Sequence, residues 1–161
     1  MKPFSGNKEP DGLFGPSAFS GEGFMGNDSR TREKIIADDA ATLTRLSLNS
    51  NSLCAMLHAA YNLAERMSGA PAALDNGIVA VHHEARGRIP SPFPCDGTFE
   101  KGETHIIDTA TGQEVVITPL SLHLIEKYGF FQGKGSRYRL EPDIALGILQ
   151  KTWYAGSSIH D

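Results

Sequence analysis

Residues 50–69 read SNSLCAMLHAAYNLAERMSG, and this stretch carries the strongest helical pattern in the chain. Its apolar residues recur at spacings of three and four, which places them on one face of an α-helix. They are Leu53, Met56, Leu57, Ala60, Ala64 and Met67. Residues 49–51 supply a turn and a cap before the helix, and Gly69 followed by Pro71 ends it. The sequence therefore predicts an amphipathic helix whose apolar face packs against another layer.

A second helix is expected just before this one. Its apolar stripe consists of Ile36, Ala40, Leu43 and Leu46. Asp28 or Ser29 can cap its start, and the pattern ends near Leu48. Because so short a turn separates the two helices, we expect them to form a helical hairpin.

Three stretches beyond the hairpin are typical of β-strands. Residues 78–85 are rich in Val and Ile, and residues 104–109 and 113–118 flank the turn Ala110-Thr111-Gly112. Residues 87–102 hold Pro90, Pro92 and Pro94, which predicts an irregular connection. We expect a small antiparallel sheet of about three strands.

Two helices are predicted near the C-terminus. Thr118 and Pro119 are a cap and a first helical residue, and Gly129 ends this short helix. Pro142 opens the last helix, which carries Ile144 and Ile148. The predicted fold class is α+β, with a helical hairpin and two C-terminal helices packed on the sheet in one domain over residues 27–161.

An irregular arm over residues 1–26 precedes this domain. Its many Gly and Pro residues suppress regular structure, yet it also contains Phe14, Phe19 and Phe24. A spacing of five fits neither a helical face nor an alternating strand, so each Phe needs its own pocket. We expect these anchors to dock on the chain's own domain, on a second copy or on a partner.

Composition narrows the class of protein. The 161 residues include fifteen Lys and Arg against nineteen Asp and Glu, a net charge of −4 that disfavours coating nucleic acid or an anionic membrane. No stretch approaches the roughly 20 apolar residues that cross a bilayer, and the N-terminus lacks the apolar segment of a signal peptide. Two dispersed cysteines form no disulfide framework. We therefore expect a cytoplasmic protein with no membrane partner.

The loop GFFQGKGSRYR, residues 129–139, is the most chemically distinctive stretch. It is no phosphate-binding P-loop, because the glycine spacing differs and Gly135 follows Lys134. Lys134, Arg137 and Arg139 can hold an anion, and Tyr138 can stack on a base or a partner's side chain. The alternative is a structural loop whose arginines pair with acids of the same domain.

Histidines and cysteines raise the question of a metal. Residues 120–124, LSLHL, resemble the helix of a two-Cys, two-His zinc finger, with His123 at the first histidine position. The second histidine is missing, since Lys127 and Tyr128 stand there. If any metal bound, Cys95, His105 and His123 would be its candidate ligands. Spacing brings none of them together, so we expect no metal or other cofactor.

The neighbouring pair His82-His83 lies on a predicted strand, so the two side chains should face opposite sides of the sheet. Only one of them can therefore contribute to any single site.

These observations favour a non-catalytic cytoplasmic accessory or regulatory protein that docks on a larger partner. The N-terminal arm and the loop from Gly129 to Arg139 would make the contacts, with a protein partner or a second copy of the chain. The alternatives are a small metal-dependent enzyme with a His/Cys site and a nucleic-acid-binding regulator that uses the basic aromatic loop. No catalytic motif supports the enzyme hypothesis, which we consider the weaker one.

Overall fold

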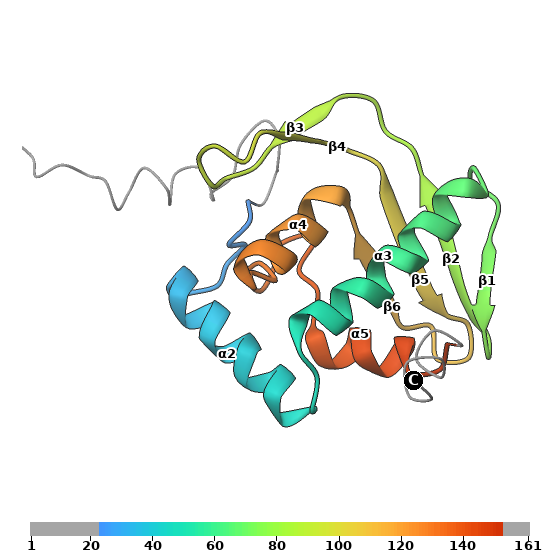
Figure 1. The fold of residues 1–161 in the computed structure, drawn as a ribbon, viewed down its shortest axis with the longest axis horizontal. Coiled ribbons are helices and arrows are strands. Elements are labelled where there is room, and N and C mark those ends of the chain that lie inside the picture. The colour runs from blue at the N-terminus through green and yellow to red at the C-terminus, as the bar shows by residue number, and fades with distance from the viewer. Residues whose placement is uncertain (1–22, 153–161) are drawn as a thin grey trace, which may run out of the picture.

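Antiparallel strands form the main sheet, in the order β1-β2-β5-β6 (Figure 1). They are β1 (Ala72–Asp75), β2 (Ile78–His83), β5 (Glu103–Asp108) and β6 (Glu114–Ile117). The structure is a computed structural model that describes residues 23–152. Side chains alternate between the two faces, and Ile78, Ala80 and Ile106 enter the core from one of them. The predicted α+β fold is confirmed.

Helices pack on that face of the sheet and against one another. They are α2 (Arg32–Arg45), α3 (Ser50–Arg66), α4 (Pro119–Tyr128) and α5 (Pro142–Leu149). Figure 1 shows α3 running across the strands, with α4 beside it, while α2 packs against α5. Within residues 23–152, no helix has the length and apolar character needed to span a bilayer.

Helix α3 carries the centre of the core. Asn49 caps it by accepting a hydrogen bond from the backbone N–H of Ser52 at 2.8 Å, as the turn predicted. Leu53 and Leu57 are fully buried. Met67, which the stripe included, is 44% exposed because the helix has already ended at its C-cap. The predicted stripe is therefore confirmed from Leu53 to Ala64, and its extension to Met67 was wrong.

The buried face of α2 differs by one position from the predicted one. Ile35 and Asp39 are buried, whereas Ile36 is only half-buried and Ala40 is exposed. The reason is a tertiary contact, because the carboxylate of Asp39 pairs with the Arg139 guanidinium inside the domain. The polar residue Asp39 therefore belongs to the buried face of α2, and a pattern of apolar residues cannot predict this.

The start of α2 also differs from the prediction. Thr31 is the N-cap, and its hydroxyl accepts from the backbone N–H of Lys34 at 3.1 Å. Asp28 is occupied elsewhere, since its carboxylate accepts from the backbone N–H of Lys134 at 3.0 Å. The cap predicted at Asp28 or Ser29 was wrong for this reason.

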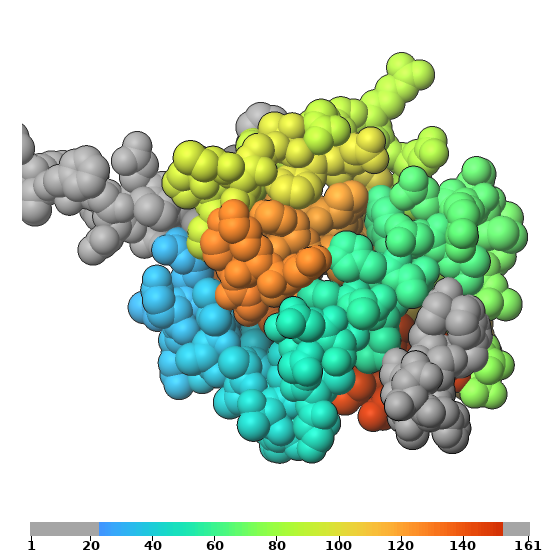
Figure 2. Space-filling model, viewed as in Figure 1, coloured from blue at the N-terminus to red at the C-terminus, as the bar shows by residue number. Residues whose placement is uncertain are grey.

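The proline-rich connection contains regular structure that the sequence did not indicate. Strands β3 (Arg88–Pro90) and β4 (Thr98–Glu100) pair antiparallel as a second, two-stranded sheet. Ile89 faces Phe99 in its register. Pro90 ends β3, and the other two prolines lie in the turn beyond it, so they do not interrupt the pairing. Figure 2 shows this hairpin, in yellow, lying against α4, in orange.

Asp96, at the tip of this hairpin, fastens it to α4. Its carboxylate has no exposed surface and accepts hydrogen bonds from Ser91, His123, Lys127 and Tyr128 at 2.8 to 3.0 Å. Burial by itself would raise the pKa of Asp96, but these four hydrogen bonds outweigh burial and hold the pKa well below the ordinary 3.8.

This arrangement predicts a pH-dependent contribution to stability. Because the pKa of Asp96 is lower in the folded state than its ordinary value of 3.8, the ionised carboxylate stabilises the fold above pH 3.8. This stabilisation is lost as the pH falls through the pKa of the folded state. We expect Asp96→Asn to destabilise the domain at pH 7, and we expect its difference from the wild type to shrink steadily as the pH falls below 3.8. Urea unfolding of both proteins across this range measures the difference. A difference that stays constant with pH would contradict the assignment.

Candidate functional site

The 129–139 loop is built into the domain at its base. Gly129 adopts a left-handed conformation (φ 65°) that ends α4, and Phe130 and Phe131 are fully buried. The backbone N–H of Gly133 donates to the carbonyl of Phe24 at 2.8 Å. A Cβ on Gly133 would lie 2.2 Å from the Met25 carbonyl oxygen, so glycine is required for this close approach. The loop and the end of the arm are therefore held together by their backbones.

Arg139 lies inside the domain. Its guanidinium donates to both carboxylate oxygens of Asp39 at 2.7 and 2.8 Å and to the carbonyl of Gln132 at 2.8 Å. Only 7% of its side chain is exposed. This guanidinium holds the loop on α2, so it is not available to an external anion.

Arg137, Tyr138 and Lys134 reach the surface. The Tyr138 hydroxyl donates to Glu103 at 2.7 Å, and Arg137 lies 3.5 Å from the same carboxylate with 68% of its side chain exposed. Lys134 is exposed, while its backbone N–H is bound to Asp28. Arg137 therefore offers a guanidinium, and Lys134 an ammonium, at the surface of the loop.

A cleft of about 380 Å³ lies beside this loop, and we call it the loop cleft. Its apolar lining is Phe24, Ala85, Ile89 and Leu120. Its polar lining is His83, Glu84, Glu100, Lys101, Glu103, Thr118, Gln132, Arg137 and Tyr138. The volume falls within the roughly 300 to 1,000 Å³ typical of ligand pockets, and apolar walls with a few polar groups are their usual composition.

Strand register brings further polar groups to the loop cleft. His83 pairs opposite Glu103 across β2 and β5, and the His83 and His105 rings contact edge to face at 4.9 Å. Nε2 of His105 lies 2.9 Å from Glu103. Burial alone would raise the pKa of Glu103, but its hydrogen bonds with Tyr138 and His105 and the nearby Arg137 charge lower it, so the group stays ionised.

The arm anchors divide between described and undescribed parts of the chain. Phe14 and Phe19 lie outside residues 23–152. Phe24 is 7% exposed and packs with Leu120, Leu124 and Phe130. Phe24 therefore docks on the chain's own domain and at the same time lines the loop cleft.

The candidate metal ligands lie in separate environments. Cys95 is exposed, His105 contacts Glu103, and His123 contacts the buried carboxylate of Asp96. In the described part of the chain, no three His, Cys, Asp or Glu side chains group so that they could hold a metal ion. The three candidates therefore do not form one site.

Sequence reasoning missed His83, Glu103 and Glu100 as partners of the loop. No local motif joins them to Arg137 and Tyr138, because strand pairing and the return of the chain after β4 bring them together.

Comparisons with protein-family models, with curated proteins and with solved structures found no match for this chain.

Proposed function

We propose that this chain is a non-catalytic accessory or regulatory protein of the cytoplasm that docks on a larger protein partner through the loop cleft. One observation carries the proposal. The end of the arm, at Phe24, and the loop, at Gln132, Arg137 and Tyr138, line the same cleft. The two segments proposed as contact regions therefore form a continuous surface.

The lining of the cleft indicates the chemistry of the partner. Phe24, Ile89 and Leu120 suit an apolar or aromatic side chain, which is the usual anchor of a protein interface. Arg137 stands exposed at the cleft, where it can bind a carboxylate of the partner. We expect a partner segment that inserts an apolar side chain and places an acidic residue beside it.

A protein suits this surface better than a nucleic acid. Glu84, Glu100 and Glu103 line the cleft together with the two cations Lys101 and Arg137. Phosphates would meet three carboxylates there, and phosphate contacts supply most of the affinity for nucleic acids. The basic-loop hypothesis for nucleic acid also loses Arg139, which is buried in its ion pair.

The test compares two charge reversals. We expect Arg137→Glu to weaken binding of the native partner about tenfold or more, because an acid at the cleft repels the partner's carboxylate. Arg45→Glu is the matched control, since Arg45 is exposed on α2 and does not line the cleft. Partners captured from the native cell by the tagged full chain are quantified by mass spectrometry, and the Kd of the purified partner is then measured by calorimetry.

If both variants lose the partner equally, or if neither variant loses it, the loop cleft is not the docking site. Capture of nucleic acid in place of protein, with an affinity that falls steeply with salt, would favour the nucleic-acid hypothesis instead.

A further inference from the structure

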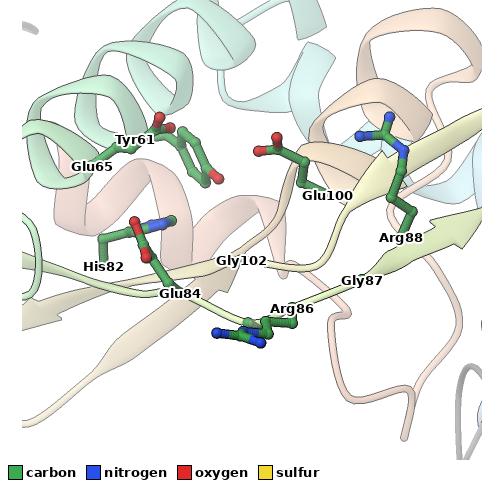
Figure 3. Close-up of a pocket in the computed structure, with 10 residues that line it drawn as sticks. Tyr61, Glu65, His82, Glu84, Arg86, Gly87, Arg88, Glu100 and Gly102 are labelled. Atoms are coloured by element: carbon green, nitrogen blue, oxygen red, sulfur yellow. The ribbon is translucent and has the colours of Figure 1, made fainter.

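A second cleft, of about 570 Å³, lies next to the loop cleft, and we call it the His82 cleft (Figure 3). Glu84, Ala85 and Glu100 line both clefts, so the chain segments leaving β2 and entering β5 separate them. His82 belongs to the helix-covered face of the sheet, and His83 to the other face. The two clefts therefore share these three residues but differ in the rest of their linings.

His82 is positioned rigidly in this cleft. It is 5% exposed, and Nδ1 lies 2.9 Å from the hydroxyl of Thr104, its register partner on β5. The ring also packs edge to face on Tyr61 at 5.2 Å. One ring nitrogen is thus occupied, while Nε2 has no hydrogen-bond partner within residues 23–152.

The Tyr61 hydroxyl is a second polar group at this cleft. Tyr61 extends from α3 and is 7% exposed, and its hydroxyl makes no hydrogen bond to the described part of the chain. Burial, together with the charges of Glu65 and Glu100, raises the pKa of Tyr61 to about 12, so the phenol stays neutral. Neither the Tyr61 hydroxyl nor His82 Nε2 is fully enclosed, so both atoms can form a hydrogen bond with a molecule that enters the cleft.

Gly102 keeps both atoms accessible. A Cβ at this position would lie 3.0 Å from Cε1 and 3.1 Å from Nε2 of His82, and 3.6 Å from the Tyr61 hydroxyl. Its φ lies outside the left-handed region, so the backbone does not require glycine. The absence of a side chain here therefore serves to leave the His82 and Tyr61 groups open.

The charges around the cleft favour a cation. Its lining holds three carboxylates, of Glu65, Glu84 and Glu100, and two guanidinium groups, of Arg86 and Arg88. None of the three carboxylates forms an ion pair with another residue of the described chain. Figure 3 shows Glu65, Tyr61 and Glu100 along one side, with Arg88 beyond Glu100, and Arg86 on the opposite side.

We propose that the His82 cleft binds a small organic cation through a protonated amino group. The carboxylates of Glu65 and Glu100 supply the counter-charge, and the Tyr61 oxygen accepts one N–H of the ligand. His82 Nε2 supplies a further polar contact beside it. This binding is separate from docking at the loop cleft and does not depend on it.

The test uses an amine and its uncharged isostere as probes. Isotope-labelled full-length protein is titrated with 1,4-diaminobutane and with 1,4-butanediol while the ring resonances of His82 and Tyr61 are followed by NMR. We expect saturable shifts with the diamine below about 10 mM and none with the diol. Equal shifts with both probes, or no saturable shift with the diamine, would overturn the proposal.

Three variants assign the effect to the cleft. We expect Tyr61→Phe, Glu65→Gln and Gly102→Ala each to raise the Kd of the diamine about tenfold or more. Glu33→Gln is the control, because this carboxylate is 76% exposed on α2 and does not line the cleft. Since the Tyr61 hydroxyl has no partner within the described residues, Tyr61→Phe should keep the wild-type melting temperature. Unchanged affinity in Tyr61→Phe and Glu65→Gln would contradict the assigned site.

Discussion

Replacing Arg139 by alanine is expected to destabilise the domain by about 3 to 5 kcal/mol, the usual cost of leaving one charge of a buried ion pair without its partner. Asp39, its partner, has 5% of its side chain exposed and would remain between α2 and the loop without a counter-charge. The same change removes the hydrogen bond to the carbonyl of Gln132. Chemical unfolding of both proteins measures the loss.

Arg137→Ala is the matched control, two residues away in the same loop. Its guanidinium is largely exposed and lies 3.5 Å from Glu103, so its removal should cost less than about 1 kcal/mol. If both arginine variants lost the same stability, the ion pair between Asp39 and Arg139 would not be what holds the loop on α2.

Leu57→Ala is expected to destabilise the domain by about 2 to 5 kcal/mol, as truncation of a fully buried leucine does. Leu57 has no exposed surface and belongs to the core between α3 and the sheet, together with Ile78 and Ile106. The loss combines the buried apolar area with the cavity that remains. Urea unfolding of the variant gives its magnitude.

Met67→Ala, one residue past the end of the same helix, is the control for this change. Met67 is 44% exposed, so the substitution should alter the free energy of unfolding by less than about 0.5 kcal/mol. If Leu57→Ala also changed the free energy of unfolding by less than about 0.5 kcal/mol, the apolar face of α3 would not be the centre of the core.

Elements with strong local signals could be predicted from the sequence. Thr118, Pro119 and Gly129 delimit α4 as expected, and Thr118 forms a capping box with Ser121. These features depend on neighbouring residues alone. Strand β1 (Ala72–Asp75) could not be predicted, because its sequence Ala-Ala-Leu-Asp lacks the β-branched and aromatic residues typical of strands.

Contacts between residues that are far apart in the sequence account for the other differences between the predicted and the observed fold. The buried position of Asp39 depends on Arg139, which follows it by 100 residues. The opposite directions of His82 and His83 were predicted and are confirmed, yet alternation alone could not tell which of them enters the core. The pairing of His82 with Thr104 across β5 is a matter of register, which no local pattern reveals.

The candidate site could be predicted only in part. The loop was singled out by its composition, and Arg137 and Tyr138 do line the loop cleft together with Phe24. His83 and Glu103 on the adjoining strands carried no signal that connects them to that loop. The His82 cleft needs Tyr61 from α3 and Gly102, the residue before β5, so it exists only once the helix lies on the sheet.

Hydrogen–deuterium exchange of the full chain, measured free and bound to its captured partner, tests the docking proposal most directly. We expect slower exchange in residues 23–28, 83–89 and 132–138, which surround the loop cleft. Slower exchange confined to the exposed faces of α2 and α3, with these three segments unchanged, would contradict docking at the loop cleft.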